Sequence, residues 1–110
     1  MADNFKERFS QAVKETETVV YSYLPEETGH QKTIFEAMNY SVKAGGKRLR
    51  PLLMREVYRL FGGNGPEIEP FMAAMEMIHT SSLIHDDLPC MDNDEYRRGK
   101  FTTWKAYGYD

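Results

Sequence analysis

The sequence predicts an all-α domain, on three observations. Apolar residues recur at helical spacing in four successive segments, and short glycine or proline connections separate these segments. No stretch shows the convincing period of two that is typical of a strand. Four helical segments with short connections favour helices packed on helices. With 110 residues the chain is long enough for one modest domain, residues 1–110.

The first predicted helix extends from about Asn4 to Leu24, because its apolar residues recur at intervals of four and seven. Pro25 and Gly29 end it. A second predicted helix runs from about Ile34 to Val42, until two consecutive glycines interrupt it. These connections are short, so we expect the helices to pack on each other.

The third predicted helix begins near Pro51 and carries one apolar stripe, which glycines at 62, 63 and 65 end. Its members are Leu49, Leu52, Leu53, Val57, Leu60 and Phe61. Pro66 opens a fourth helix, which must end near Leu88 because Pro89 disfavours helix in the residue before it. The fourth helix is expected to turn these residues inward: Phe71, Ala74, Met75, Ile78, Ser82 and Leu83. The methionines of FMAAMEM are most simply core packing.

Composition and charge exclude several classes of protein. The formal net charge of -3 gives no general reason to bind nucleic acid or an anionic membrane. The amphipathic N-terminus is not a signal peptide, and no apolar run is long enough to span a membrane. A single cysteine, Cys90, excludes an internal disulfide and is a poor zinc candidate. We therefore expect a cytoplasmic protein.

The stretch HDDLPCMDNDEYRRGK concentrates acids and then bases. The acids are Asp86, Asp87, Asp92 and Asp94. Mg²⁺ prefers oxygen ligands and typically binds one or two carboxylates plus substrate phosphates, which Asp86 and Asp92 could supply. A continuous helix would carry Asp92 about 9 Å farther along the axis, but the break at Pro89 lets the chain bend back. The alternative interpretation is a solvated turn after a helix, which charge clusters usually are.

Two further elements add to this motif. His79 lies seven residues before Asp86, so two helical turns place both on one face, although a lone histidine is more often a core or surface residue. In KAGGKRLRP, paired glycines expose backbone N–H groups, and the bases Lys47, Arg48 and Arg50 follow at a helix start, which favours an anion. A basic turn between two helices is the alternative. Two cationic groups flanking one acidic site suit a reaction in which diphosphate leaves.

Together, GGKRLRP at 45–51, EMIHTSSLIHDD at 76–87 and DDLPCMDNDEYRRGK at 86–100 resemble the N-terminal third of the trans-isoprenyl diphosphate synthases, the polyprenyl synthetase family. The bacterial farnesyl and geranylgeranyl diphosphate synthases are the most similar type. The resemblance implies part of the all-helical isoprenoid synthase bundle, a homodimer when full length. It also implies a Mg²⁺-dependent transferase in isoprene biosynthesis, which condenses isopentenyl diphosphate with dimethylallyl, geranyl or farnesyl diphosphate.

The resemblance also assigns the residues. Asp86, Asp92 and Arg97 would be catalytic, with magnesium on Asp86 and Asp92 and with Asp87 as a supporting metal carboxylate. Isopentenyl diphosphate would be held by Lys47, Arg50, His79 and Arg98. Arg97 would hold the allylic diphosphate, and no role is assigned to Asp94.

The sequence departs from the family pattern in one serious way. The second aspartate-rich motif of the family has no counterpart before Asp110, so we expect a truncated, inactive N-terminal fragment of one domain. The alternative is a non-catalytic diphosphate-binding or regulatory subunit related to the synthases. Ser81, five residues before Asp86, stands where the family forms the floor of its product pocket. Its small side chain suggests a product longer than farnesyl diphosphate.

Overall fold

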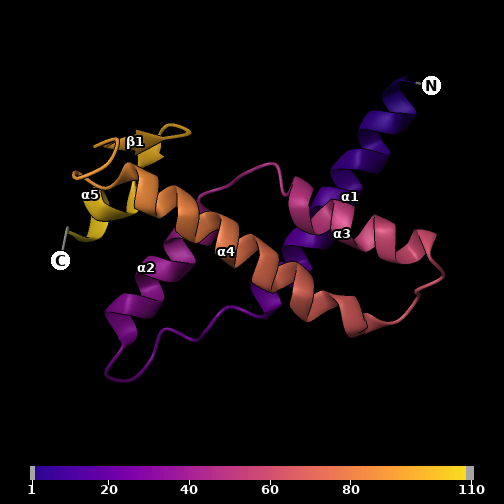
Figure 1. Cartoon of the computed structure of the whole chain (residues 1–110), viewed down its shortest axis with the longest axis horizontal. Helices are drawn as coiled ribbons and strands as arrows, with labels where there is room; N and C mark the ends of the chain where they lie inside the picture. The colour runs from indigo at the N-terminus through magenta and orange to yellow at the C-terminus, as the bar shows by residue number, and fades with distance from the viewer. Residues whose placement is uncertain (1, 109–110) are drawn as a thin grey trace. The chain divides into compact units, whose positions relative to one another are not determined.

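The computed structural model describes the backbone of residues 2–108 and the side chains of residues 4–108. Five α-helices, one short 3₁₀ helix and a two-stranded sheet follow one another along this part of the chain (Figure 1). The prediction of an all-α fold is therefore confirmed, apart from the small sheet. No helix in the described part combines the length and the apolar character needed to cross a lipid bilayer.

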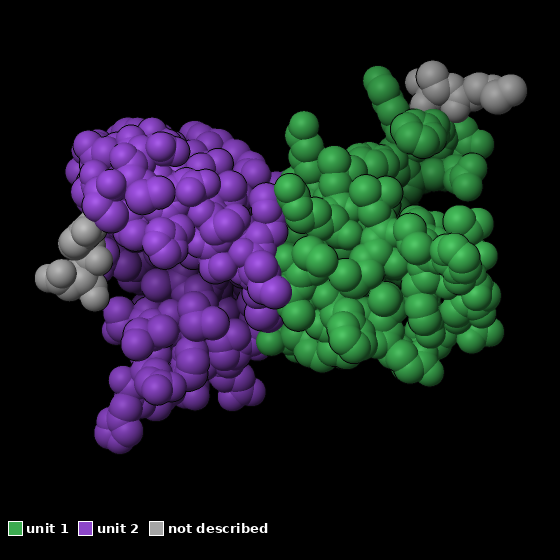
Figure 2. Space-filling model, in the orientation of Figure 1, with its two compact units in different colours: residues 1–23, 47–76 green, residues 24–46, 77–110 purple. Residues whose placement is uncertain are grey.

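The chain divides into two compact units, which are coloured separately in Figure 2. Unit 1 comprises residues 1–23 and 47–76, and unit 2 comprises residues 24–46 and 77–110. The long helix α4 (Glu69–Asp87) contributes its first turns to unit 1. Its remaining turns belong to unit 2 and lead into the acidic motif.

Unit 1 contains α1 (Ala2–Ser22), α3 (Leu49–Leu60) and the 3₁₀ helix η1 (Pro66–Ile68). Helix α1 packs against α3, and Arg55 Nη2 donates to Glu15 Oε2 across them at 3.3 Å. Pro66 begins the 3₁₀ helix rather than α4 itself, so the fourth α-helix starts three residues later than its predicted first residue.

Unit 2 contains α2 (Lys32–Lys43), the hairpin strands β1 (Tyr96–Arg97) and β2 (Lys100–Phe101), and α5 (Thr103–Tyr107). Helix α2 packs against α5, where the rings of Tyr40 and Tyr107 meet edge to face with centroids 5.5 Å apart. The prediction that the chain has no strand is wrong here. Each strand has only two residues, too few to show an alternating pattern.

The inward face predicted for α4 is wrong, and the apolar stripe of α3 is mostly exposed. On α3 only Leu52 of the apolar stripe is buried, and Leu60 and Phe61 are 80% and 85% exposed. On α4, Phe71 and Ile78 are more than half exposed. The buried face of α4 lies on the opposite side of the helix and consists of Met72, Ala73, Glu76, Thr80 and Asp87.

The physical reason is that α4 carries apolar side chains on both sides. Met72 and Ala73 give its buried face enough apolar area to pack, while Glu76 and Asp87 on the same face are compensated by buried ion pairs. A helix that is apolar on several sides does not reveal from its sequence which side faces the core. The rule that apolar faces point inward therefore selected the wrong side.

Candidate functional site

The acidic motif begins where α4 ends, and its backbone turns back on itself. The Leu88 carbonyl accepts hydrogen bonds from the backbone N–H groups of Met91 and Asn93, both at 2.9 Å. The N–H of Asp92 donates to the carbonyl of Asp86 at 2.8 Å. The predicted return of Asp92 to Asp86 is thus present in the backbone, and Pro89 lies at the bend.

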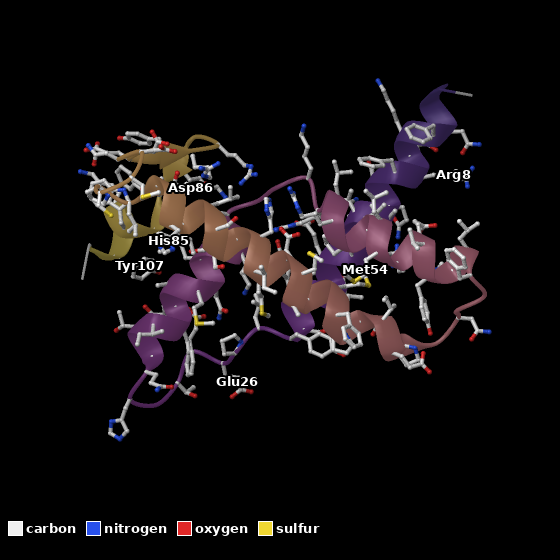
Figure 3. All side chains as sticks on the ribbon, viewed as in Figure 1. Arg8, Glu26, Met54, His85, Asp86 and Tyr107 are labelled. Atoms are coloured by element: carbon white, nitrogen blue, oxygen red, sulfur yellow. The ribbon has the colours of Figure 1, made fainter. Side chains whose placement is uncertain are left out.

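The side chains of Asp86 and Asp92 are both exposed, and Figure 3 shows Asp86 in the last turn of α4. Within residues 4–108, no group of three or more His, Cys, Asp or Glu side chains is placed to hold a metal ion. Mg²⁺ does not need such a group, because it typically keeps several waters and takes one or two carboxylates plus phosphate oxygens. Two exposed aspartates brought together by one turn fit that donor set.

Asp87 lies in a different environment from Asp86 and Asp92. Its side chain is 5% exposed and accepts two hydrogen bonds from Arg97, Nε to Oδ2 at 2.9 Å and Nη2 to Oδ1 at 2.7 Å. The hydrogen bond to Asp87 is the main reason that the pKa of Arg97 is raised, and the negative charges of Asp94 and Asp86 add to it. The acids and Arg97 therefore form one electrostatic cluster within unit 2.

Arg97 and Arg98 are presented by the hairpin. Arg98 and Gly99 connect the two strands, and their φ angles of 52° and 77° are both positive. Two positive φ values are the requirement of a type I′ hairpin turn, for which asparagine followed by glycine is the usual choice. Arg98 therefore adopts an unfavourable left-handed conformation. Its Nη1 donates a long hydrogen bond of 3.4 Å to the carbonyl of Gly45.

Side chains that the sequence analysis did not single out anchor the hairpin and the preceding loop. The Asp94 carbonyl accepts from Thr102 Oγ1 at 2.8 Å and from Trp104 Nε1 at 2.7 Å. The Tyr40 hydroxyl donates to the carbonyl of Phe101 at 2.6 Å, and the Ser41 and Thr103 hydroxyls are hydrogen-bonded to each other. The Tyr40 bond fastens the hairpin to α2, and the Ser41–Thr103 pair joins α2 to α5. No motif in the sequence signals these contacts.

The basic residues after the glycine pair have two different environments. Lys47 and Arg50 are exposed, whereas Arg48 between them is buried in unit 1. The Arg48 guanidinium donates to Glu17 and to Glu76 at 3.1 Å each, and to the Tyr21 hydroxyl at 3.0 Å. Arg48 therefore belongs to an internal network, and of these three bases only Lys47 and Arg50 are at the surface.

The sequence-predicted site residues are divided between the units. Lys47 and Arg50 belong to unit 1. His79 is half-buried on α4 in unit 2, two helical turns before Asp86. Within unit 2 the structure joins three pairs. Asp92 is hydrogen-bonded to Asp86 through the backbone, Arg97 to Asp87 through the side chains, and Arg98 to the carbonyl of Gly45.

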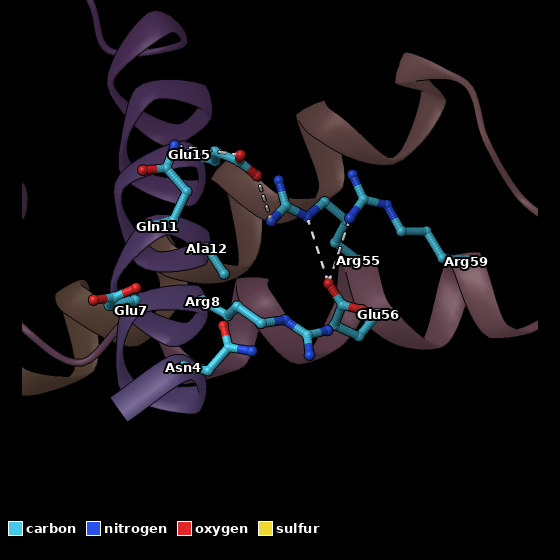
Figure 4. A pocket seen from close by; sticks show the side chains of 9 residues that line it. All are labelled: Asn4, Glu7, Arg8, Gln11, Ala12, Glu15, Arg55, Glu56 and Arg59. Carbon is cyan, nitrogen blue, oxygen red and sulfur yellow. Dashed lines mark hydrogen bonds and ion pairs between the residues drawn. The ribbon is translucent and has the colours of Figure 1, made fainter. Parts of the chain in front are cut away.

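Two hollows in the molecule contain none of these residues. In unit 1, a hollow of about 470 Å³ is lined by three arginines and three glutamates among other residues. Figure 4 shows that four of these charges pair with one another, because Arg55 lies between Glu15 and Glu56 and Arg59 also reaches Glu56. In unit 2, a hollow of about 330 Å³ lies beside Tyr40 and Tyr107. The candidate site is therefore the surface cluster around the acidic motif.

Comparison with known proteins gives a consistent result. Residues 31–110 match the family described as polyprenyl synthetase. The chain is 58% identical over 77 residues to a farnesyl diphosphate synthase of Micrococcus luteus, which is 70% of this chain and 26% of that protein. It is 60% identical over 77 residues to a chloroplastic geranylgeranyl pyrophosphate synthase of Capsicum annuum, covering 70% of this chain and 21% of that protein.

Solved structures agree with the sequence comparisons. The apo structure of an FPP/GFPP synthase from Zymomonas mobilis matches with a TM-score of 0.84 and 42% identity, over 98% of this chain and 39% of that one. A geranyltranstransferase from Thermotoga maritima matches with a TM-score of 0.82 and 37% identity, over 94% of this chain and 38% of that one. The chain spans about a quarter of the length of the two curated relatives. With the family matching 80 of its 110 residues, the chain belongs to the polyprenyl synthetase family.

Proposed function

We propose that this chain forms the first diphosphate-binding and Mg²⁺-binding part of a prenyltransferase. The enzyme joins isopentenyl diphosphate to an allylic diphosphate, which is dimethylallyl, geranyl or farnesyl diphosphate, and makes a short-chain isoprenyl diphosphate. The observation that carries the proposal is the turn that returns Asp92 to Asp86 beside Arg97. The relatives named as farnesyl and geranylgeranyl synthases support the same class of reaction.

Each residue has a separate task in the allylic half of this site. Asp86 and Asp92 would hold Mg²⁺ through their exposed carboxylates. Bound there, Mg²⁺ supplies positive charge for the diphosphate that departs when the allylic carbon ionises. Arg97 binds the same diphosphate and shares in stabilising its developing charge. Its guanidinium stays charged at any pH at which the reaction would run.

The isopentenyl half depends on direct contacts rather than on metal. Lys47 and Arg50 are exposed at the start of α3, and Arg98 is exposed in the hairpin turn. The resemblance assigns these three bases and His79 to the diphosphate of isopentenyl diphosphate, whose double bond would attack the allylic carbocation. We further propose that the enzyme works in the cytoplasm as a homodimer, as the resemblance implies. The exposed thiol of Cys90 is compatible with a reducing compartment.

The test is a chimera of the Micrococcus luteus synthase in which its aligned 77-residue segment is replaced by the matching segment of this chain. We expect the chimera to convert isopentenyl and dimethylallyl diphosphates into a longer prenyl diphosphate, and only when Mg²⁺ is present. A chimera that folds and binds both diphosphates without turnover would contradict the proposed prenyltransferase activity. That outcome would favour a non-catalytic diphosphate-binding subunit.

A further inference from the structure

The two adjacent aspartates of the motif differ in exposure, and this difference separates their roles. Asp86 is exposed at the turn, whereas the Asp87 side chain is 5% exposed on the buried face of α4. Both oxygens of Asp87 already accept short hydrogen bonds from one guanidinium. A carboxylate in this state has little surface left for a hydrated ion, which needs near-octahedral access.

We propose that Asp87 is a positioning residue for Arg97 and does not ligate the metal; the proposal rests on the function proposed above. Asp87 engages Arg97 from the side, through Nε and Nη2. A guanidinium has five N–H donors in a rigid plane, and this side-on pair uses two of them. The remaining three donors, on the far end of the fork, are those that suit a phosphate group.

The backbone fixes the same geometry from a second direction. The carbonyl of Asp87 accepts the N–H of Asp94 at 3.1 Å, which ties the loop after α4 to the same residue. Arg97 is in β1, directly before the tight turn of the hairpin. Asp87 thus connects the end of α4, the acidic loop and the hairpin. Without the Asp87 carboxylate, the Arg97 side chain would be free to rotate. Binding diphosphate would then have to order it again, which lowers the affinity.

The experiment measures binding of inorganic pyrophosphate to this 110-residue chain by calorimetry across a series of Mg²⁺ concentrations. Asp87→Asn should weaken pyrophosphate binding about tenfold at saturating Mg²⁺, the effect of one lost hydrogen bond to a charged group. The Mg²⁺ concentration at half-maximal binding should not change. Asp86→Asn should instead raise that concentration. Glu95→Gln is the matched control, because it is an equal charge change in the same loop on a side chain that pairs with Lys105, and it should behave like the wild type.

A second variant tests the coupling between the two residues. Arg97→Lys keeps the charge but cannot form the side-on fork, so adding Asp87→Asn to it should cause no further loss of affinity. The Arg97 Nε–H signal in NMR spectra should shift in Asp87→Asn and stay in place in Glu95→Gln. Dispersed backbone amide signals in the same spectra show that both variants are folded.

Three results would overturn the inference and leave the proposed function standing. The first is wild-type pyrophosphate affinity in Asp87→Asn, and the second is recovery of its pyrophosphate binding at high Mg²⁺. The third is a double variant whose loss of affinity equals the product of the losses in Asp87→Asn and Arg97→Lys. If Asp87→Asn does not fold, Asp87→Glu replaces it. The glutamate keeps the charge but shifts the carboxylate, and it should weaken binding with the same unchanged Mg²⁺ requirement. If the wild-type chain does not bind pyrophosphate with Mg²⁺, both the function and the inference fail.

Discussion

The backbone N–H of Asp92 donates to the carbonyl of Asp86 at 2.8 Å, although six positions separate them along the chain. Together with the bonds from the N–H groups of Met91 and Asn93 to the Leu88 carbonyl, it closes the loop after α4, where both carboxylates are exposed. Like charges on one turn repel unless a cation or neighbouring bases compensate them. Arg97 compensates part of the charge of Asp86, which contributes to the raised pKa of Arg97.

The first prediction concerns the proposed metal ligands. In the Micrococcus luteus chimera, Asp86→Asn and Asp92→Asn should each reduce turnover at saturating substrate by about 10²-fold or more, because charge stabilisation in the transition state is lost. Steady-state kinetics at several Mg²⁺ concentrations would measure the loss. Glu95→Gln serves as the control, since that exposed side chain pairs with Lys105, and it should change turnover by less than about threefold. Equal effects at 92 and 95 would contradict the assignment.

The second prediction separates the two diphosphates by their need for metal. Chelation of divalent ions should abolish binding of the allylic diphosphate to the chimera, because Asp86 and Asp92 alone repel it. Binding of isopentenyl diphosphate should persist, because the bases proposed to hold it, Lys47, Arg50 and Arg98, need no metal to attract a diphosphate. Calorimetry with each ligand, with and without EDTA, checks this. Equal loss of both ligands would show that the basic residues do not form a separate site.

The third prediction uses the strained turn. Arg98 has a φ of 52° in a position that asparagine prefers, so Arg98→Asn should preserve or raise the free energy of unfolding, by up to about 1 kcal/mol. The same change removes a cation and should weaken isopentenyl diphosphate binding to the chimera about tenfold. Urea unfolding of this chain and calorimetry of the chimera give the two values. Lower stability together with unchanged binding would mean that Arg98 serves the hairpin alone.

The fourth prediction concerns the buried network in unit 1. Arg48→Met leaves the carboxylates of Glu17 and Glu76 without their guanidinium, and it should lower the free energy of unfolding by about 3–5 kcal/mol. Lys47→Met is the matched control one residue away, exposed in the structure, and should change stability by less than about 0.5 kcal/mol. Urea unfolding followed by circular dichroism compares them. Similar values for the two variants would show that the network does not stabilise this unit.

The fifth prediction concerns product length. Ser81 is exposed on α4, and its hydroxyl donates to the carbonyl of Ile78 at 2.7 Å. In the chimera, Ser81→Tyr should shorten the longest product, because the larger ring occupies space that a growing chain needs. Ser81→Ala is the control and should leave the product unchanged. Chromatography of the dephosphorylated products would decide, and an identical product distribution in Ser81→Tyr would exclude this residue from the pocket floor.

Much of the site could be predicted from the sequence, because the signals are local. Pro89 after a helical pattern predicts a break, and the break lets Asp92 return to Asp86. The glycine at 99 is only part of a hairpin-turn signal, because arginine and not asparagine precedes it. The flanking strands are too short to show alternation, so the sequence does not predict them.

What the sequence did not reveal depends on contacts between distant segments. Asp87 and Asp86 are identical in type and adjacent, yet only Asp87 is paired, because α4 turns it toward the buried side. In the sequence, Arg48 is one of three bases expected at the surface. The fold instead buries it and brings Glu17 and Glu76 to its guanidinium. Neither relationship leaves a local pattern in the sequence. Arg97 is 10 positions from Asp87, and the partners of Arg48 are 31 and 28 positions away.

The most direct test of the central claim replaces Mg²⁺ by Mn²⁺ and records NMR spectra of this chain with pyrophosphate. Paramagnetic broadening falls steeply with distance, so it locates the ion. The account predicts that the amide signals of Asp86 and Asp92 broaden first, together with the Nε–H of Arg97, and that Asp86→Asn abolishes the effect. Broadening centred on another part of the chain, or unchanged by Asp86→Asn, would contradict it.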